Sequence, residues 1–361
     1  MSLNLDKNFN WFNNKQTPLL IAGPCSAESR EQVINTAKEL KKEKVNIYRA
    51  GIWKPRTRPG SFEGVGSIGL EWLKEVKQEI ELPVATEVAN TSHVEQALKF
   101  DIDILWIGAR TSVNPFAVQE IADALAGVDI PIMIKNPINP DLDLWIGAFE
   151  RFNKVGINKL AAIHRGFSTH EKTIFRNKPQ WQIPIELKKR IPELPIICDP
   201  SHIAGNRDLL YKISQKAIDL NFHGLMIESH LDPTSALSDK NQQVTPNDLS
   251  KIIAKIIIRK TKSSDNQFKI QIAELRQQID NVDEELLNLL CERMNIAEMV
   301  GKLKSDNGVT ILKTARWREI LRNRTQSGEQ KGLSKAFIIK LLKAIHQESI
   351  NRQASVMEPL N

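Results

Sequence analysis

Residues 195–230 read PIICDPSHIAGNRDLLYKISQKAIDLNFHGLMIESH, and this stretch decides the fold. Apolar runs at 195–202 and 224–230 flank an amphipathic stretch at 208–220. Apolar strands that alternate with helices are typical of a parallel sheet covered by helices. The stretch therefore predicts a strand–helix–strand unit, with polar and charged residues at the carboxyl end of each strand.

The same unit repeats along the first 260 residues. Eight apolar runs are expected to be strands: 18–25, 45–51, 83–88, 104–110, 131–136, 159–166, 195–202 and 224–230. Helices are expected at 30–43, 70–81, 94–100, 115–126, 142–155, 208–220 and 246–259. Eight such units in about 250 residues predict a closed (β/α)8 TIM barrel over residues 1–260. An open doubly wound sheet is the alternative.

The composition changes after Arg259. Residues 260–267 (KTKSSDNQ) are polar, and we place a linker at 261–267. Apolar residues from Ile272 to Leu303 then recur at spacings of three and four, which predicts one helix of about 40 residues. Such a helix cannot bury its apolar stripe (its seam) alone, so we expect it to pack against partner helices, including helices of a second chain.

Two shorter helices are expected at 314–326 and 333–353, separated by Gly328 and Gly332. Together with the long helix they predict a small all-α domain over residues 268–361. The chain is thus expected to hold two domains of different class.

Composition excludes several classes of protein. The chain has 361 residues, 41% of them apolar, yet no apolar run of about 18 residues that would span a membrane. No secretory signal is visible at the start, and the three cysteines are too few and odd in number for a disulfide framework, which predicts a cytoplasmic location. The net charge of +7 permits nucleic-acid binding, but the basic residues lie at strand ends and along one helix, which argues against it.

Side chains that bind metals lie at the ends of the first, seventh and eighth expected strands. Cys25, His202 and Glu228 come from strands that adjoin once the barrel closes, and Asp239 follows the eighth strand. Thiolate, imidazole and carboxylate ligands together suit a divalent transition metal. Manganese is our first choice, with iron, zinc and cobalt open. Cys25 alone has a second interpretation as a small buried side chain, which for Cys198 is the favoured one.

Cations gather at the same expected strand ends. They are Arg49, Lys54, Arg56, Arg110, Lys135 and Arg165. Such a density of guanidinium and ammonium groups suits phosphate and carboxylate groups at several points. As a set they predict one or two substrates with several negative groups.

Seven motifs in this segment resemble a known family. They are GPCSAE at 23–28, KPRT at 54–57, IGAR at 107–110, IKN at 134–136, DPSH at 199–202, IESH at 227–230 and ALSD at 236–239. In this order they resemble the 3-deoxy-D-arabino-heptulosonate 7-phosphate (DAHP) synthases of the type I-beta branch, over residues 18–260. KPRT separates this family from the related octulosonate 8-phosphate synthases.

The resemblance implies a transferase that condenses phosphoenolpyruvate with erythrose 4-phosphate. This reaction belongs to the shikimate pathway, which leads to the aromatic amino acids. It implies Cys25, His202, Glu228 and Asp239 as ligands of the divalent metal. It implies Arg49, Lys54, Arg110, Lys135 and Arg165 around phosphoenolpyruvate, and Arg56 and Thr57 at the phosphate of erythrose 4-phosphate. Lys54 is expected to handle the proton at the new hydroxyl, with His202 sharing proton transfer. His164 stands where relatives often have glutamate, and its role is open.

The expected long helix carries two cations on its apolar seam. Arg293 continues the seam, and Lys304 lies within about 20° of the same face. Because an unpaired charge on an apolar face is costly, the two cations predict a buried anion site. The alternative is that Arg293 reaches out of the seam to water. Arg276 lies about 100° around the helix, so we expect it to reach a partner chain's site.

This second region resembles the all-helical (type II) chorismate mutases over residues 268–355. The resemblance is carried by LRQQID at 275–280, CER at 291–293, GKLK at 301–304 and ESINRQ at 348–353. It implies an isomerase for chorismate to prephenate, with a homodimer through this domain and a tetramer as an option. The implied binding groups are Arg276, Arg293, Lys304, Arg316, Ser349 and Gln353, of which Lys304 and Gln353 act at the breaking ether oxygen.

Two positions depart from that pattern. Trp317 stands where the family often has glutamate, and Lys313 where aspartate is common. These departures leave the contact to the substrate hydroxyl unassigned. They motivate a second hypothesis, in which the helical domain is mainly a dimerising allosteric sensor of chorismate or prephenate.

Overall fold

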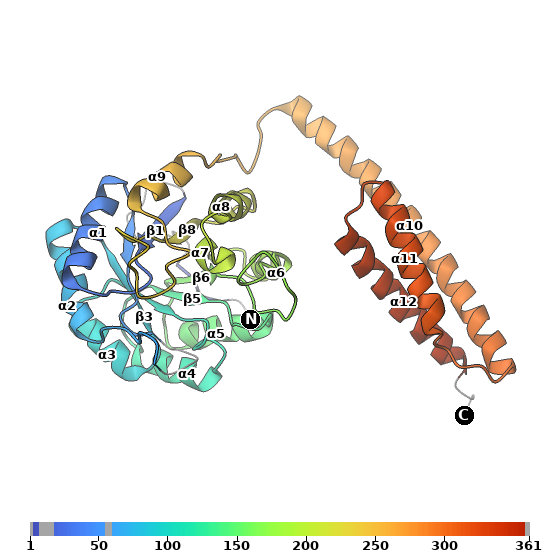
Figure 1. The fold of residues 1–361 in the computed structure, drawn as a ribbon, viewed down its shortest axis with the longest axis horizontal. Coiled ribbons are helices and arrows are strands. Elements are labelled where there is room, and N and C mark those ends of the chain that lie inside the picture. The colour runs from blue at the N-terminus through green and yellow to red at the C-terminus, as the bar shows by residue number, and fades with distance from the viewer. Residues whose placement is uncertain (1–2, 7–17, 55–59, 358–361) are drawn as a thin grey trace. The chain divides into compact units, whose positions relative to one another are not determined.

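The computed structural model describes residues 3–6, 18–54 and 60–357, and it divides the chain into two compact units, Met1–Thr261 and Lys262–Asn361 (Figure 1). Arg56 and Thr57 lie outside the described residues. None of the described helices is both long and apolar enough to cross a membrane.

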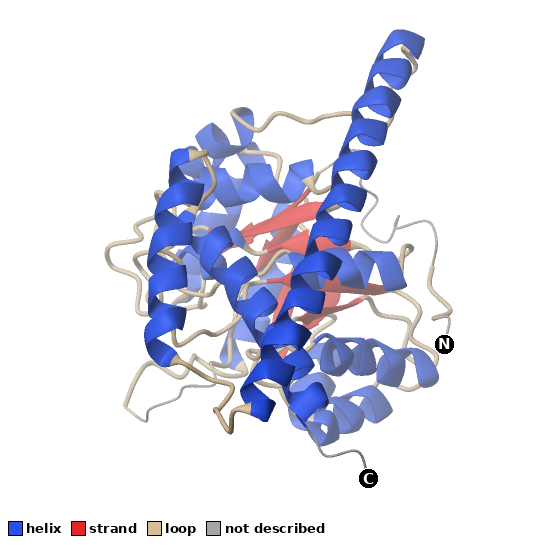
Figure 2. Cartoon of the chain, turned by 90° about the vertical axis from the view of Figure 1, so that its right-hand side faces the viewer, coloured by secondary structure: helices blue, strands red, loops and turns tan. Residues whose placement is uncertain are grey.

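In the described part of the first unit, eight parallel strands form a closed barrel in sequence order. Figure 2 shows these strands in red, enclosed by helices. The strands are Leu19–Gly23 (β1), Ile47–Arg49 (β2), Val84–Val88 (β3), Ile104–Ile107 (β4), Ile132–Lys135 (β5), Leu160–His164 (β6), Ile196–Cys198 (β7) and Gly224–Glu228 (β8). β1 closes the barrel against β8, with Gly23 opposite Glu228. The predicted barrel is confirmed, and the open-sheet alternative is wrong.

Helices follow the strands. They are Arg30–Lys42 (α1), Ile68–Glu75 (α2) with a π-helical continuation Val76–Ile80 (η1), Thr91–Lys99 (α3), Pro115–Ala124 (α4), Leu142–Lys154 (α5), Gln182–Arg190 (α6), Pro200–Ala204 (α7), Leu210–Asp219 (α8) and Pro246–Ala254 (α9). Several begin at a side-chain cap: Ser29, Asn90, Asn114, Asp141 and Thr245 each accept a backbone N–H of the first turn.

The expected strand at 195–202 is too long. β7 ends at Cys198, where Asp199 caps α7 by accepting the N–H of His202, and Pro200 occupies the first helical turn. Proline at this position favours a helix start, because it needs no hydrogen bond there. His202 therefore lies on a short helix at the barrel rim rather than on a strand.

Side chains alternate between two apolar layers along the strands. The barrel interior contains Leu19, Ile21, Ile47, Ala85, Ile104, Trp106, Met133, Ala161, Ile163, Ile197 and Met226. The larger core, which includes Cys198 as expected, lies between strands and helices. Because direction repeats every two residues, the next inward positions are Arg49, Glu87, Lys135 and Glu228. The alternation that fills the barrel with apolar side chains therefore also directs charged side chains inward at the carboxyl end of the barrel.

The second unit contains three helices among its described residues: Asn266–Asp306 (α10), Thr314–Gln330 (α11) and Lys335–Met357 (α12). α12 packs against both others. The predicted long helix is confirmed at 41 residues. Gly328 does not separate two helices but lies inside α11, where a Cβ would come within 2.5 Å of Ile338.

Part of the seam of α10 stays uncovered within one chain. Leu275, Ile279, Val282, Leu286 and Leu289 are each more than half exposed. Such a continuous apolar stripe on a helix is unfavourable in water. The helical unit by itself therefore leaves this face without a packing partner among its described residues.

Candidate active site at the barrel rim

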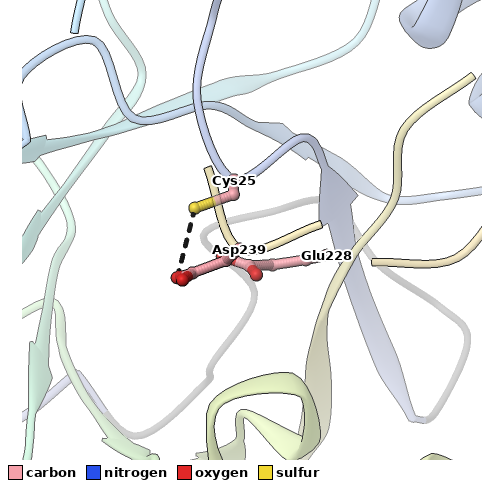
Figure 3. Close-up of side chains that lie close together, drawn as sticks. All are labelled: Cys25, Glu228 and Asp239. Atoms are coloured by element: carbon pink, nitrogen blue, oxygen red, sulfur yellow. Dashed lines mark hydrogen bonds between the residues drawn. The ribbon is translucent and has the colours of Figure 1, made fainter. Parts of the chain in front are cut away.

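Three candidate metal ligands meet at the seam that closes the barrel. Cys25 follows β1, Glu228 ends β8, and Asp239 lies in the loop between β8 and α9. One ligand atom of each lies within 4.8 Å of the others (Figure 3). The Cys25 Sγ is 3.6 Å from Asp239 Oδ2. Asp239 has a φ of 47°, a left-handed conformation uncommon for a non-glycine residue and often found at functional sites.

His202 lies beside this trio. Its Nε2 is 3.8 Å from Glu228 Oε1, and its Nδ1 is 2.8 Å from Asp199 Oδ2. A carboxylate behind one ring nitrogen, with the other nitrogen facing the ligand atoms, is the common arrangement of metal-binding histidines. The four ligands expected from the sequence are therefore neighbours, with Asp199 as an orienting partner.

The charges of the cluster fit a divalent cation. Burial and, after it, the nearby Glu228 carboxylate raise the pKa of the Cys25 thiol to about 11. Burial also opposes ionisation of Glu228, but His202 and Arg49 outweigh that effect and lower the pKa of this carboxyl. A bound cation reverses the balance at the sulfur, because a coordinating thiol is deprotonated. The donor set of one thiol, two carboxylates and one imidazole thus suits a divalent transition metal.

Cations surround the cluster. Arg49 Nη1 donates to Glu228 Oε1 at 2.9 Å, and Lys54 Nζ lies 3.2 Å from Cys25 Sγ. Lys135 Nζ pairs with Asp199 Oδ2 at 2.9 Å. Arg49 and Lys135 are both buried. Each of the three cations is thus paired with a candidate metal ligand or with its orienting carboxylate.

The indole of Trp106 lies beneath the buried cations. The Arg49 guanidinium is 4.7 Å and the Lys135 ammonium 5.8 Å from its ring centroid, distances that permit cation–π attraction. Its Nε1 donates to Glu87 Oε2 at 2.8 Å. Gly108 permits this arrangement, since a Cβ there would come within 2.1 Å of the Glu87 carboxylate.

Arg165 extends the cationic region toward β6. Burial lowers the pKa of its guanidinium to about 10, and the charge of Arg110 contributes in the same direction. Its Nη1 donates to Asn177 Oδ1 at 2.8 Å, while Asn136 accepts its backbone N–H at 2.7 Å. Asn177 also donates to the backbone carbonyl of His202 at 2.6 Å. One asparagine therefore connects a candidate anion-binding arginine with a candidate metal ligand.

His164 points away from this site. Its ring lies among Phe167, Trp181 and Phe222 in the layer between strands and helices, with centroid distances of 5.8, 5.1 and 6.2 Å. Burial lowers the pKa of its imidazole to about 3, and Arg165 adds to that shift. The position left open by the sequence is a packing position.

A second candidate site lies between α10 and α12. Lys304 Nζ donates to Gln353 Oε1 at 2.8 Å, and Arg293 donates to Ser349 Oγ. Gln353 Nε2 donates to the Ser349 carbonyl at 3.1 Å, which links the two pairs. Four of the six expected binding groups therefore lie together.

The other two binding groups are exposed and stand apart from those pairs. Arg276 is exposed on α10, and Arg316 forms an ion pair with Glu319 at 2.8 Å. Trp317 stacks on His346, with ring centroids 3.9 Å apart. The unexpected tryptophan thus has an aromatic partner within the same chain.

These features define a class. The chain is a (β/α)8-barrel protein whose buried cations and candidate metal ligands occupy the carboxyl ends of the strands, where barrel proteins place their active sites. Residues 6–264 match the model of the DAHP synthetase I family. The chain belongs to this family. Residues 275–354 match the model of chorismate mutase type II.

Known proteins agree with the family. The chain is 34% identical over 225 residues to a phospho-2-dehydro-3-deoxyheptonate aldolase of Thermotoga maritima, which covers 62% of this chain and 64% of that protein. A 2-dehydro-3-deoxyphosphooctonate aldolase of Thioalkalivibrio sulfidiphilus is 27% identical over 238 residues, with 61% of this chain and 81% of that protein covered. A crystal structure of the Thermotoga maritima DAHP synthase superposes with a TM-score of 0.60 at 31% identity, covering 66% of this chain and 67% of that one.

Proposed function

We propose that the barrel unit condenses phosphoenolpyruvate with D-erythrose 4-phosphate to give DAHP and phosphate, with a divalent metal ion. The observation that carries this proposal is the contact between the candidate metal ligands and the cations. Arg49 pairs with Glu228 and Lys54 lies against Cys25, so an anion held by these cations would lie beside the ligands. The choice of the four-carbon sugar rests on the KPRT motif, whose residues beyond Lys54 lie outside the described part of the chain.

The residues suggest a division of labour. Arg49, Lys135 and Arg165 hold the phosphate and carboxylate of phosphoenolpyruvate, and their charges offset its repulsion from the sugar phosphate. When bound, the metal ion supplies Lewis-acid polarisation of the aldehyde oxygen. The methylene carbon of phosphoenolpyruvate bonds to the aldehyde carbon, and water adds to the carbon that carries the phosphate ester. The carbon–oxygen bond to phosphate then breaks, phosphate leaves, and the added oxygen becomes the ketone oxygen of the product. Lys54 delivers the proton to the new hydroxyl, with His202 within reach of the same region.

Consumption of phosphoenolpyruvate by purified, chelator-stripped protein tests this proposal. Manganese-dependent loss with erythrose 4-phosphate but not with arabinose 5-phosphate is expected. Loss with the five-carbon sugar alone would move the chain to octulosonate chemistry. No loss with either sugar, from folded protein supplied with manganese, iron, zinc or cobalt, would refute the synthase assignment.

We propose further that the helical unit rearranges chorismate to prephenate. The reaction needs a site that holds a compact dianion and stabilises charge on the breaking ether oxygen. Arg293 suits a carboxylate, and the Lys304–Gln353 pair suits the ether oxygen. Lys304→Ala should abolish chorismate turnover, while Lys302→Ala, an exposed neighbour on the same helix, should not. Equal activity of the two variants would contradict the assignment.

The exposed seam of α10 supports a homodimer in which Arg276 of one chain completes the site of the other. A second candidate function follows from Trp317, which stacks on His346 and stands where the family often has glutamate. In that case the helical unit binds chorismate or prephenate and regulates the barrel. Altered synthase rates on adding prephenate, without chorismate turnover, would favour this function. We place both activities in the cytoplasm and at the head of aromatic amino-acid biosynthesis.

A further inference from the structure

The strongest unassigned feature is a buried amide between the two carboxylates of the metal cluster. Gln242, in the loop between β8 and α9, is 1% exposed. Its Nε2 donates to Glu228 Oε2 at 2.7 Å and lies 3.5 Å from Asp239 Oδ2. Its Oε1 accepts from Arg176 Nη1 at 2.7 Å, and the same nitrogen is 3.0 Å from Asp239 Oδ1.

The backbone explains how the amide reaches this position. Val244 donates its N–H to the carbonyl of Glu228, and His230 donates to the carbonyl of Val244, so the segment runs along the end of β8. Gln243 then serves the other side, because its Oε1 accepts the N–H of Cys25 at 2.9 Å. Two consecutive glutamines therefore contact Cys25, Glu228 and Asp239, the three residues of the cluster.

The orientation of the Gln242 amide is fixed by its neighbours. Arg176 can only donate, so it must face Oε1, and the NH2 group must then face the carboxylates. The buried Glu228 carboxylate and the partly buried Asp239 carboxylate repel each other, and a shared donor offsets part of that repulsion. The hydrogen bond also fixes the plane of the Glu228 carboxylate, whose Oε1 faces Arg49 and His202.

We propose that Gln242 is a positioning residue for the divalent-cation site, and that Arg176 holds its amide in the required orientation. This inference rests on the proposed metal dependence. Groups that hydrogen-bond to metal ligands tune affinity, and their loss typically weakens binding about 10- to 100-fold. Gln242 acts here on carboxylate ligands.

Cobalt titration of the metal-stripped full chain tests the proposal. A thiolate-to-cobalt absorption band in the wild type reports the bond to Cys25, independently of catalysis. Gln242→Met keeps the volume but removes the hydrogen bonds to Glu228, Asp239 and Arg176. We expect its cobalt dissociation constant to rise about 10- to 100-fold. Gln215→Met on α8, which removes a surface amide that contacts Asp219 and Ile257, is the matched control and should bind as the wild type does.

The outcomes separate this inference from the proposed function. Wild-type affinity in folded Gln242→Met would overturn the positioning role and leave the metal site standing. Absence of the cobalt–thiolate band in the wild type would refute the metal site itself, and the inference with it. If Gln242→Met does not fold, Arg176→Met decides, because that side chain is 43% exposed and its loss should also weaken cobalt binding. Unchanged affinity there would overturn the proposal.

Discussion

Replacing Gly301 by alanine should separate α10 from α12 where the second candidate site lies. A Cβ at Gly301 would come within 2.7 Å of Val356 Cγ2 and 2.9 Å of the Cα of Gln353. The Val356 methyl can rotate away, but the backbone of Gln353 can move only with its helix. Since Gln353 pairs with Lys304, the displacement acts on that contact directly.

Two opposing terms set the size of the effect. Alanine favours a helix over glycine by about 1 kcal/mol. Overpacking typically costs about 1–3 kcal/mol. The net change in unfolding free energy is therefore a loss of up to about 2 kcal/mol, taken as the difference between the two terms. Chorismate turnover should fall more than stability, because catalytic contacts tolerate little displacement.

Gly147 provides the matched control. It lies inside α5, and a Cβ there would meet nothing within 4 Å. Gly147→Ala should therefore stabilise the barrel by up to about 1 kcal/mol, so the difference between the variants isolates the clash. Hydrogen exchange of α12 peptides and chorismate turnover are the measurements. Wild-type exchange and turnover in Gly301→Ala would refute the reasoning.

Three further predictions concern the barrel. Burial lowers the pKa of the His164 imidazole to about 3, against 6.5 in the unfolded state. As the pH falls below 6.5, the unfolded state therefore binds the proton first, and the protein loses stability. His164→Phe should remove a loss of about 2 kcal/mol between pH 8 and pH 5 in urea unfolding; an unchanged pH dependence would contradict this. Arg49→Met should lower the unfolding free energy by about 3–5 kcal/mol, because it leaves Glu228 buried without its arginine partner. Arg30→Met, which breaks the ion pair of an exposed arginine with Glu75, should cost little. Equal urea midpoints for the two variants would refute the contrast. Asn177→Ala should raise the KM for phosphoenolpyruvate by releasing the neighbouring guanidinium, with chorismate turnover unchanged as the internal control.

The fold could be predicted because its apolar pattern is periodic. Strand–helix alternation predicted the barrel, and the three–four spacing predicted the long helix. The helix Gln182–Arg190 was missed because its sequence, QIPIELKKR, contains a proline in the first turn and few apolar residues. The strand at 195–202 was extended too far because Asp199 and Pro200, which start a helix, follow the apolar run directly.

The residues of the candidate site fall into the same two groups, those that a periodic pattern predicts and those that it does not. Arg49, Lys135 and Glu228 are the last residues of strands whose alternation determines their direction, so the sequence could bring them together. Gln242 and Asn177 lie in loops without a period, and some of their partners, such as Arg176 for Gln242 and His202 for Asn177, are far away in the sequence. A sequence motif can identify such loop residues only when the residues next to them have a recognisable chemical role.

The candidate metal ligands come together only where the barrel closes. Cys25 follows the first strand and Glu228 ends the last, and the pairing of Gly23 with Glu228 is one of the five that close β1 against β8. A shift of that pairing by one residue would turn Glu228 to the other face of the sheet, because side-chain direction alternates. A divalent ion held by both strands would bind only the correctly closed barrel and would stabilise it by mass action. The position of these ligands therefore couples the proposed activity to the integrity of the fold.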